Sequence, residues 1–174
     1  MDKAILIGIQ EYIRNDYLTP VMLFVTGIGN FGAVWLFVAM LLAFRRSSRG
    51  QGVLLLISIL FCGGVNECIK HAVMRPRPFL QIPDLILLGP LPRSFSFPSG
   101  HTVCAFALAF IVWRLHRGWV RILVMALAVV MAFSRLYLGA HYPTDVLAGV
   151  VVAYLGSAFV WRMGKKIGQV INIG

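Results

Sequence analysis

Three short polar segments interrupt an otherwise apolar chain, and each holds residue types that bind or transfer phosphoryl groups. Lysine and arginine bind phosphate oxygens, and the guanidinium fork can hold two oxygens at once. Histidine and aspartate can attack, move protons or orient a neighbouring ring. The segments contain Lys70, Arg77 and Pro78; Pro98, Ser99, Gly100 and His101; and Ser134, Arg135, His141 and Asp145.

Lys70 and Arg77 are separated by six residues and follow a long apolar run. Cations at the end of a transmembrane helix can simply extend their charged groups toward the membrane surface. The functional alternative is that the ammonium and the guanidinium converge on the oxygens of one phosphate.

The segment Pro98-Ser99-Gly100-His101 indicates a turn that enters a helix, with Ser99 at the N-cap. Ordinary capping explains Ser99 when the segment is taken alone. The free N–H groups and the positive dipole end of a helix start also favour a bound anion, and Gly100 lets a ligand approach the backbone. His101 would then stand beside that anion.

In the third segment Pro143 suits the first turn of a helix, which puts His141 just before the helix and Asp145 within its first turn. The carboxylate can then reach the imidazole and fix its tautomer, leaving the other ring nitrogen free to attack or to accept a proton. A satisfied polar pair is the structural alternative. A metal site is disfavoured because several cations would compete, so no metal and no cofactor are expected.

The rest of the chain must position these residues, and its composition is that of a membrane protein. Of its 174 residues, 59% are hydrophobic and only 13% are charged. This length suits one domain, 1–174, and an all-α, polytopic transmembrane helical bundle. We predict about five spans in a transmembrane core at 18–163, from apolar runs at 18–44, 53–69, 102–113, 122–138 and 146–161.

Three features modify this bundle. Residues 1–16 predict an N-terminal interfacial amphipathic helix, and no cleaved signal peptide is expected. The run at 18–44 exceeds one straight span, and Gly27, Gly29, Asn30 and Gly32 predict a tilt, kink or break. The long apolar loop at 79–97 would border a lipid entrance. The cysteines Cys62, Cys68 and Cys104 lack paired spacings and are expected to be buried free thiols.

The formal net charge of +10 comes from small groups of lysine and arginine between the apolar runs. This pattern indicates membrane topology and contact with anionic lipids, not nucleic-acid binding. The groups at 45–49, 114–121 and 162–166 must share one side of the membrane, predicted to be the cytoplasm. Further cations fall on the opposite side, where an anionic ligand would account for them: Lys70, Arg75, Arg77, Arg93 and Arg135.

Ionisable residues at membrane depth are costly, so three such segments on one side are not explained by chance. Residues 70–78, 98–101 and 134–145 resemble all three signature motifs of the type-2 phosphatidic acid phosphatase superfamily. That superfamily includes bacterial lipid phosphate phosphatases and vanadium haloperoxidases. The resemblance, with its supporting spans, covers about 18–163.

The resemblance implies a helical bundle in which His141 is the nucleophile, forming a phosphohistidine, and Asp145 orients it. His101 would protonate the leaving oxygen and later activate water. The phosphoryl oxygens would be held by Lys70, Arg77, Ser99, the backbone N–H of Gly100 and Arg135. Such cations can stabilise the charge that a metal stabilises elsewhere. Glu67 is not a signature residue and is expected to pair with Lys70 or His71.

The resemblance predicts a lipid phosphate or diphosphate as substrate, in a bacterial inner (plasma) membrane with the site on the extracytoplasmic side. Undecaprenyl diphosphate, phosphatidylglycerophosphate, phosphatidic acid and lipid A 1-phosphate all remain open. A lipid phosphotransferase would use the same intermediate, and a non-enzymatic lipid transporter would move substrate without phosphate release. A vanadate-dependent peroxidase is disfavoured because the chain lacks a soluble framework. The sequence does not predict an oligomeric state.

Overall fold

The computed structural model describes residues 1–29 and 32–171, and this part of the chain consists of helices and loops without a strand. The prediction of an all-α bundle is confirmed. The bundle helices are α2 (Leu18–Ile28), α3 (Ala33–Phe44), α4 (Arg49–Val73), α6 (Gly100–Leu115), α7 (Trp119–Tyr137) and α8 (Pro143–Ile171). The shorter elements are α1 (Asp2–Gly8), η1 (Ile9–Ile13), η3 (Arg46–Ser48) and α5 (Pro78–Gln81).

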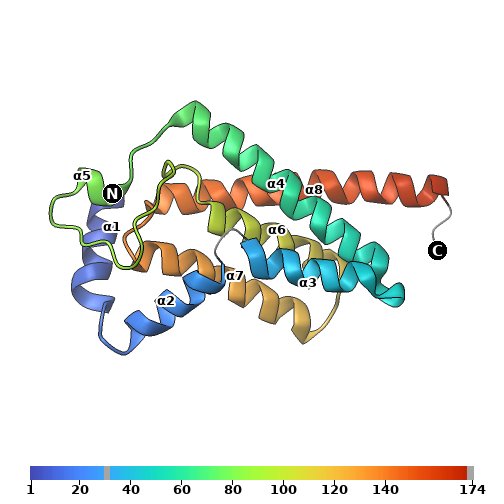
Figure 1. Cartoon of the computed structure of the whole chain (residues 1–174), viewed down its shortest axis with the longest axis horizontal. Coiled ribbons are helices and arrows are strands. Elements are labelled where there is room, and N and C mark those ends of the chain that lie inside the picture. Colours follow the sequence, from blue (N-terminus) through green and yellow to red (C-terminus); the bar gives the residue numbers. More distant parts are fainter. Residues whose placement is uncertain (30–31, 172–174) are drawn as a thin grey trace.

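All five predicted apolar runs are helical, although the helices differ in their ability to cross a bilayer. In the described residues, three helices, α4, α7 and α8, are long and apolar enough by themselves to cross a membrane, and the bent pair α2 and α3 is so only when the two are counted together. The fifth, α6, is apolar but has only 16 residues. At about 1.5 Å per residue it falls short of a hydrocarbon core of about 30 Å. Figure 1 shows that α6 starts deeper in the bundle than α8.

The predicted interruption of the first run is confirmed, since α2 ends at Ile28, α3 begins at Ala33 and their axes differ by 49°. Gly32, at the N-cap of α3, has a φ of 67°, which L side chains rarely adopt. A Cβ on Gly29 would lie 2.5 Å from the end of the Met131 side chain, so a larger residue would require that flexible side chain of α7 to move. Asn30 lies outside the described residues.

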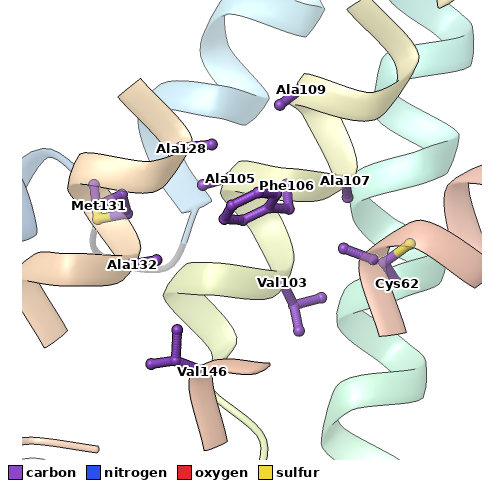
Figure 2. Packing of buried hydrophobic residues seen from close by; sticks show 11 residues of the cluster. Cys62, Val103, Ala105, Phe106, Ala107, Ala109, Ala128, Met131, Ala132 and Val146 are labelled. Carbon is purple, nitrogen blue, oxygen red and sulfur yellow. The ribbon is translucent and has the colours of Figure 1, made fainter. Parts of the chain in front are cut away.

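Helix α6 is the centre of the packing. It is in contact with α4, α7 and α8, and most of its apolar side chains are buried. Small residues such as Ala105, Ala107 and Ala109 let the neighbouring helices approach closely, as is usual for helices that pack inside membranes. Figure 2 shows part of this core, where α7 residues Ala128 and Met131 lie near α6.

The other spans keep large apolar side chains on the outside of the bundle, where lipid would cover them: Phe24, Phe37, Leu41, Leu60, Leu127, Leu147 and Leu155. This distribution agrees with a multi-pass membrane protein. The three cysteines are free, and Cys62 is buried. The expectation of three buried thiols was wrong for Cys68, which lies on the outer face of α4 and is exposed.

The N-terminal helical segment, α1 with η1, runs across one end of the bundle (Figure 1). It ends at Ile13, not at residue 16, because Asn15 instead caps the start of α2 by accepting hydrogen bonds from the backbone of Tyr17 and Leu18. Its apolar face is buried against protein, with Leu6 packed near Leu85. The interfacial placement of this helix in a membrane stays a prediction.

The three groups of lysine and arginine lie at one end of the bundle, at the right of Figure 1. There α3 meets α4, α6 meets α7, and α8 ends. Their predicted common side is confirmed as a common end of the molecule. The segments that follow α4 and α7 lie at the opposite end. That this end faces the cytoplasm stays a prediction, based on the excess of positive charge in cytoplasmic loops.

We therefore predict that Gln81→Cys and Ser47→Cys label from opposite sides of the membrane, because both side chains are exposed and lie at opposite ends. The measurement uses a membrane-impermeant thiol reagent on intact cells or spheroplasts, in a background with Cys62, Cys68 and Cys104 replaced. Gln81→Cys should react without permeabilisation and Ser47→Cys only after it. The reverse pattern would invert the orientation.

Candidate active site

The predicted site residues gather around one cavity of about 990 Å³. Six of the eight line its wall: Lys70, Arg77, Gly100, His101, Arg135 and His141. Ser99 and Asp145 do not line the cavity; both are fully buried behind it. The remaining wall is mainly apolar and comes from α2, α3, α4 and the loop after α5, with Leu23, Leu36, Ile59, Leu60, Leu87 and Leu88.

The last turns of α4 supply Lys70, whose side chain is buried. Its Nζ lies 3.3 Å from Glu67 Oε1, so the expected pairing of Glu67 is with Lys70. Asn66, one turn earlier on the same face, donates a hydrogen bond to Glu67 Oε1 at 3.1 Å. Its buried Oδ1 has no hydrogen-bond partner in the described part of the chain. A Cβ on Gly100 would lie within 3.7 Å of Lys70 Nζ, so the ammonium faces the start of α6.

Arg77 is buried on an extended stretch of backbone, which the following Pro78 favours. Its guanidinium donates to the carbonyl oxygen of Ser94 at 2.8 Å and to that of Ala140 at 2.9 Å. Its Nη1 also lies 3.1 Å from His141 Nε2. Since a guanidinium can only donate, Nε2 accepts in this contact, and the proton of the neutral ring is on Nδ1.

Helix α8 begins at Pro143, which places Asp145 in its first turn as predicted. His141 Nδ1 lies 3.6 Å from Asp145 Oδ2, just beyond hydrogen-bonding distance. The same Oδ2 accepts from Ser96 Oγ at 2.5 Å and from the Tyr142 backbone N–H at 2.9 Å. Burial lowers the pKa of His141 far below its usual range, so the ring is neutral at neutral pH.

The second segment forms the start of α6. Ser99 occupies the N-cap position, but its side chain makes no capping hydrogen bond and instead accepts from Thr102 Oγ1 at 3.0 Å. Its backbone N–H donates to the Asp145 carbonyl at 3.1 Å, which joins the starts of α6 and α8. A Cβ on Gly149 would lie 3.1 Å from the Ser99 carbonyl oxygen, so glycine permits this close approach. His101 faces the cavity and interacts electrostatically with Arg135 and His141.

Arg135 lies in the last turn of α7 and is almost completely buried. Its Nη1 donates to Thr26 Oγ1 of α2, and Thr26 also lines the cavity. In the described residues its Nε has no partner, which leaves a donor available near the cavity. Three cations thus line the same cavity as His141: Lys70 from α4, Arg77 from the segment after α4 and Arg135 from α7.

The structure adds residues to which the sequence assigned no role in the site, although Arg75 was among the cations expected near an anionic ligand. Ser96 and Arg75 contact the Asp145 carboxylate, Asn66 stands beside Lys70, and Thr26 holds Arg135. Arg75 belongs to the same Arg-Pro-Arg-Pro stretch as Arg77, so its position was a usable signal. Thr26 is a single hydroxyl in an apolar helix, and its role depends on packing with α7.

Residues 51–169 match the model of the PAP2 superfamily. The undecaprenyl-diphosphatase of Sulfolobus acidocaldarius is 33% identical over 139 residues, 80% of this chain and 67% of that protein. A crystal structure of a PAP2-type phosphatidylglycerolphosphate phosphatase from Bacillus subtilis is 30% identical, with a TM-score of 0.77 over 95% of this chain and 85% of that chain. LpxE of Aquifex aeolicus shares the fold, with a TM-score of 0.80 over 90% of this chain and 93% of that chain, at 23% identity.

The all-helical bundle, with three cations and two histidines lining one cavity, is chemically suited to binding a phosphate group. The match covers more than half of the chain and all three polar segments. This chain belongs to the PAP2 superfamily. The predicted family and enzyme class, a phosphate-ester hydrolase, are confirmed, whereas the individual residue roles stay predictions.

We predict that Arg77→Lys lowers phosphatase activity about 100-fold or more, because a lysine cannot reproduce the forked hydrogen bonds to Ser94 and Ala140 while facing His141. Phosphate release by purified protein in detergent is the measurement. Arg117→Lys, the same substitution on an exposed loop at the far end, is the control and should retain full activity. Near-normal turnover of Arg77→Lys would show that only the charge matters.

Proposed function

We propose that the chain hydrolyses a lipid phosphate or diphosphate through a phosphohistidine on His141, without a metal or other cofactor. The observation that supports this most is that one cavity is lined by His141 together with Lys70, Arg77 and Arg135, while the rest of its wall is mainly apolar. These polar residues suit a phosphate, and the apolar wall suits the hydrocarbon of a lipid.

In the first step, the lone pair of His141 Nε2 attacks phosphorus, and the bond from phosphorus to the leaving oxygen breaks. His101 donates a proton to that oxygen. In the second step, His101 takes a proton from water, the water oxygen bonds to phosphorus, and the bond to Nε2 breaks. Inorganic phosphate leaves, and both histidines return to their starting states.

The contact between Arg77 and His141 has a consequence for the first step. While Nε2 accepts from Arg77 at 3.1 Å, its lone pair is occupied. A phosphate oxygen carries more negative charge than the neutral ring and is the stronger acceptor. Binding of substrate would therefore draw the Arg77 donor onto phosphate and release Nε2 for attack.

The three cations have a second task, because negative charge spreads over the phosphoryl oxygens in the transition state. Lys70, Arg77 and Arg135 are already held by Glu67, by backbone carbonyls and by Thr26. Their positions therefore need little reorganisation during the reaction. The buried Ser99 could reach the phosphate only after a local movement, so the backbone N–H groups at the start of α6 are the better donors there.

The substrate class follows from the cavity and the relatives together. The relatives named above act on undecaprenyl diphosphate and on phosphatidylglycerophosphate by their names. We propose these two lipids as the first candidates, with phosphatidic acid and lipid A 1-phosphate beside them. Phosphate release from each lipid by the purified protein, compared at equal concentration, tests the choice. Transfer of phosphate to an added alcohol would instead indicate a phosphotransferase.

The site is proposed to face the extracytoplasmic side of a bacterial plasma membrane. The support is the separation between the polar cavity segments and the three lysine and arginine groups at the other end of the bundle. Substrate would enter laterally past the loop after α5, since Leu87, Leu88 and Leu91 of this loop line the cavity.

We predict that phosphate release continues in excess chelator, because protein cations supply the charge that a metal would supply. Activity should remain within about twofold after dialysis against EDTA, as expected when no Lewis acid takes part. Loss of turnover in chelator, with recovery on adding one divalent ion, would contradict the metal-free mechanism.

We further predict that His141→Ala and His101→Ala both abolish lipid phosphate hydrolysis, for separable reasons. Without His141 no phosphoenzyme forms with any leaving group. Without His101 an acidic phenol can still depart as its anion, so phosphoenzyme should accumulate because no base activates water. Rapid-quench trapping of an acid-labile, base-stable phosphohistidine measures this, with an aryl phosphate that the wild type accepts. A normal phosphoenzyme in His141→Ala would identify a different nucleophile.

A further inference from the structure

A second arginine, Arg75, contacts the His141–Asp145 pair from the side away from the cavity. Arg75 Nη1 donates to Asp145 Oδ1 at 2.6 Å. It does not line the main cavity, whereas Arg77, two residues later, lines that cavity and contacts His141 Nε2. The two guanidinium groups of the Arg-Pro-Arg-Pro stretch therefore meet opposite ends of the same pair.

With the contact from Arg75, both oxygens of the Asp145 carboxylate accept hydrogen bonds. Asp145 Oδ2 accepts from Ser96 and from the Tyr142 backbone and is the oxygen nearest to His141. In the described residues Oδ1 accepts a hydrogen bond from Arg75 alone. A carboxylate held at one oxygen can still turn about the bond to its Cβ. Holding both oxygens keeps Oδ2 directed at the imidazole.

Arg75 is itself fixed by the N-terminal helix. Its Nη2 lies 3.2 Å from Asp2 Oδ2, and its Nη1 also donates to Thr144 Oγ1 at 2.7 Å. Thr144 Oγ1 donates in turn to the same Asp2 oxygen at 2.5 Å. The guanidinium carbon lies 3.8 Å from the centroid of the Tyr142 ring, a cation–π arrangement. Arg75 therefore forms ion pairs with two carboxylates, those of Asp2 and Asp145.

We propose that Arg75 is a positioning residue that keeps Asp145 directed at His141, and that Asp2 of α1 holds Arg75 for this task. The proposal rests on the proposed function, in which Asp145 orients the nucleophile. It makes the N-terminal helix part of the reaction centre, although no residue of α1 or η1 lines the cavity.

The docking of this helix does not depend on Asp2, which makes a clean test possible. Gln10 Nε2 donates to the Asp84 carbonyl at 2.8 Å, and Arg14 donates to the carbonyls of Tyr137 and Ile86 at 2.7 Å each. Leu6 and Ile9 are buried against other parts of the chain. Replacing the Asp2 carboxylate therefore leaves the helix anchored at its other end.

The test compares kinetic constants of Arg75→Gln, Arg75→Lys and Asp2→Asn with the wild type. Arg75→Gln should lower kcat about 10- to 100-fold and leave KM within about twofold, because Arg75 does not line the cavity. Arg75→Lys should recover part of kcat, since lysine can still donate to Oδ1. Asp2→Asn should lower kcat about threefold to tenfold. Lys3→Gln, an exposed charge removal beside Asp2, is the control and should be unchanged.

A double-mutant cycle decides whether Arg75 acts through Asp145. In an Asp145→Asn background, Arg75→Gln and Asp2→Asn should cause no further loss. Losses that multiply, or a raised KM with unchanged kcat, would overturn the proposal. Size-exclusion chromatography in detergent shows whether Arg75→Gln is folded. If it is not, the double-mutant cycles of Arg75→Lys and of Asp2→Asn with Asp145→Asn test the proposal instead. If Asp145→Asn has the turnover of the wild type, the proposed function itself is contradicted. If Asp145→Asn is impaired but Arg75→Gln keeps the wild-type kcat, only this inference is contradicted.

Discussion

The need to keep a buried guanidinium satisfied organises the centre of this protein. A charged group in a low-dielectric region is costly unless partners surround it, and Arg77 meets this need with neutral carbonyl oxygens from Ser94 and Ala140. Neutral partners leave its positive charge available to a ligand. The same contacts join the segment after α4, the loop before α6 and the connection between α7 and α8, so the arginine that is proposed to bind phosphate also holds these segments together.

Much of the fold could be predicted because it depends on the length of the apolar runs and on the positions of glycines, and both can be read from the local sequence. The five apolar runs became helices, and the break at Gly29 and Gly32 lies where the glycines indicated it. The end of the first helix was predicted three residues too late, because Asn15 caps the next helix and so interrupts the pattern of apolar residues. A cap of this kind competes with helix continuation and is not visible in hydrophobic periodicity.

The site was predictable where residue type and function coincide, and less so where a role depends on packing. The signature segments located Lys70, Arg77, His101 and His141, all of which line the cavity. Ser99 was predicted to bind the phosphoryl oxygens; its hydroxyl is buried and accepts a hydrogen bond from Thr102 at the junction of α6 and α8, and its role stays a prediction. Which way a small side chain turns at a helix start depends on the neighbouring helix, here through the close approach at Gly149. The sequence around Ser99 does not indicate which helix packs against it.

The arrangement of helix ends explains how a short chain can build such a site inside a membrane. Free backbone groups occur at helix termini, and a membrane interior forbids leaving them without partners. Here one of these groups at the start of α6 finds its partner in α8, since the Ser99 N–H donates to the Asp145 carbonyl. That contact holds the start of α6 against the first turn of α8, and His101 and His141 line the same cavity. The short length of α6 agrees with this placement, because a helix of 16 residues at about 1.5 Å per residue does not span a hydrocarbon core of about 30 Å.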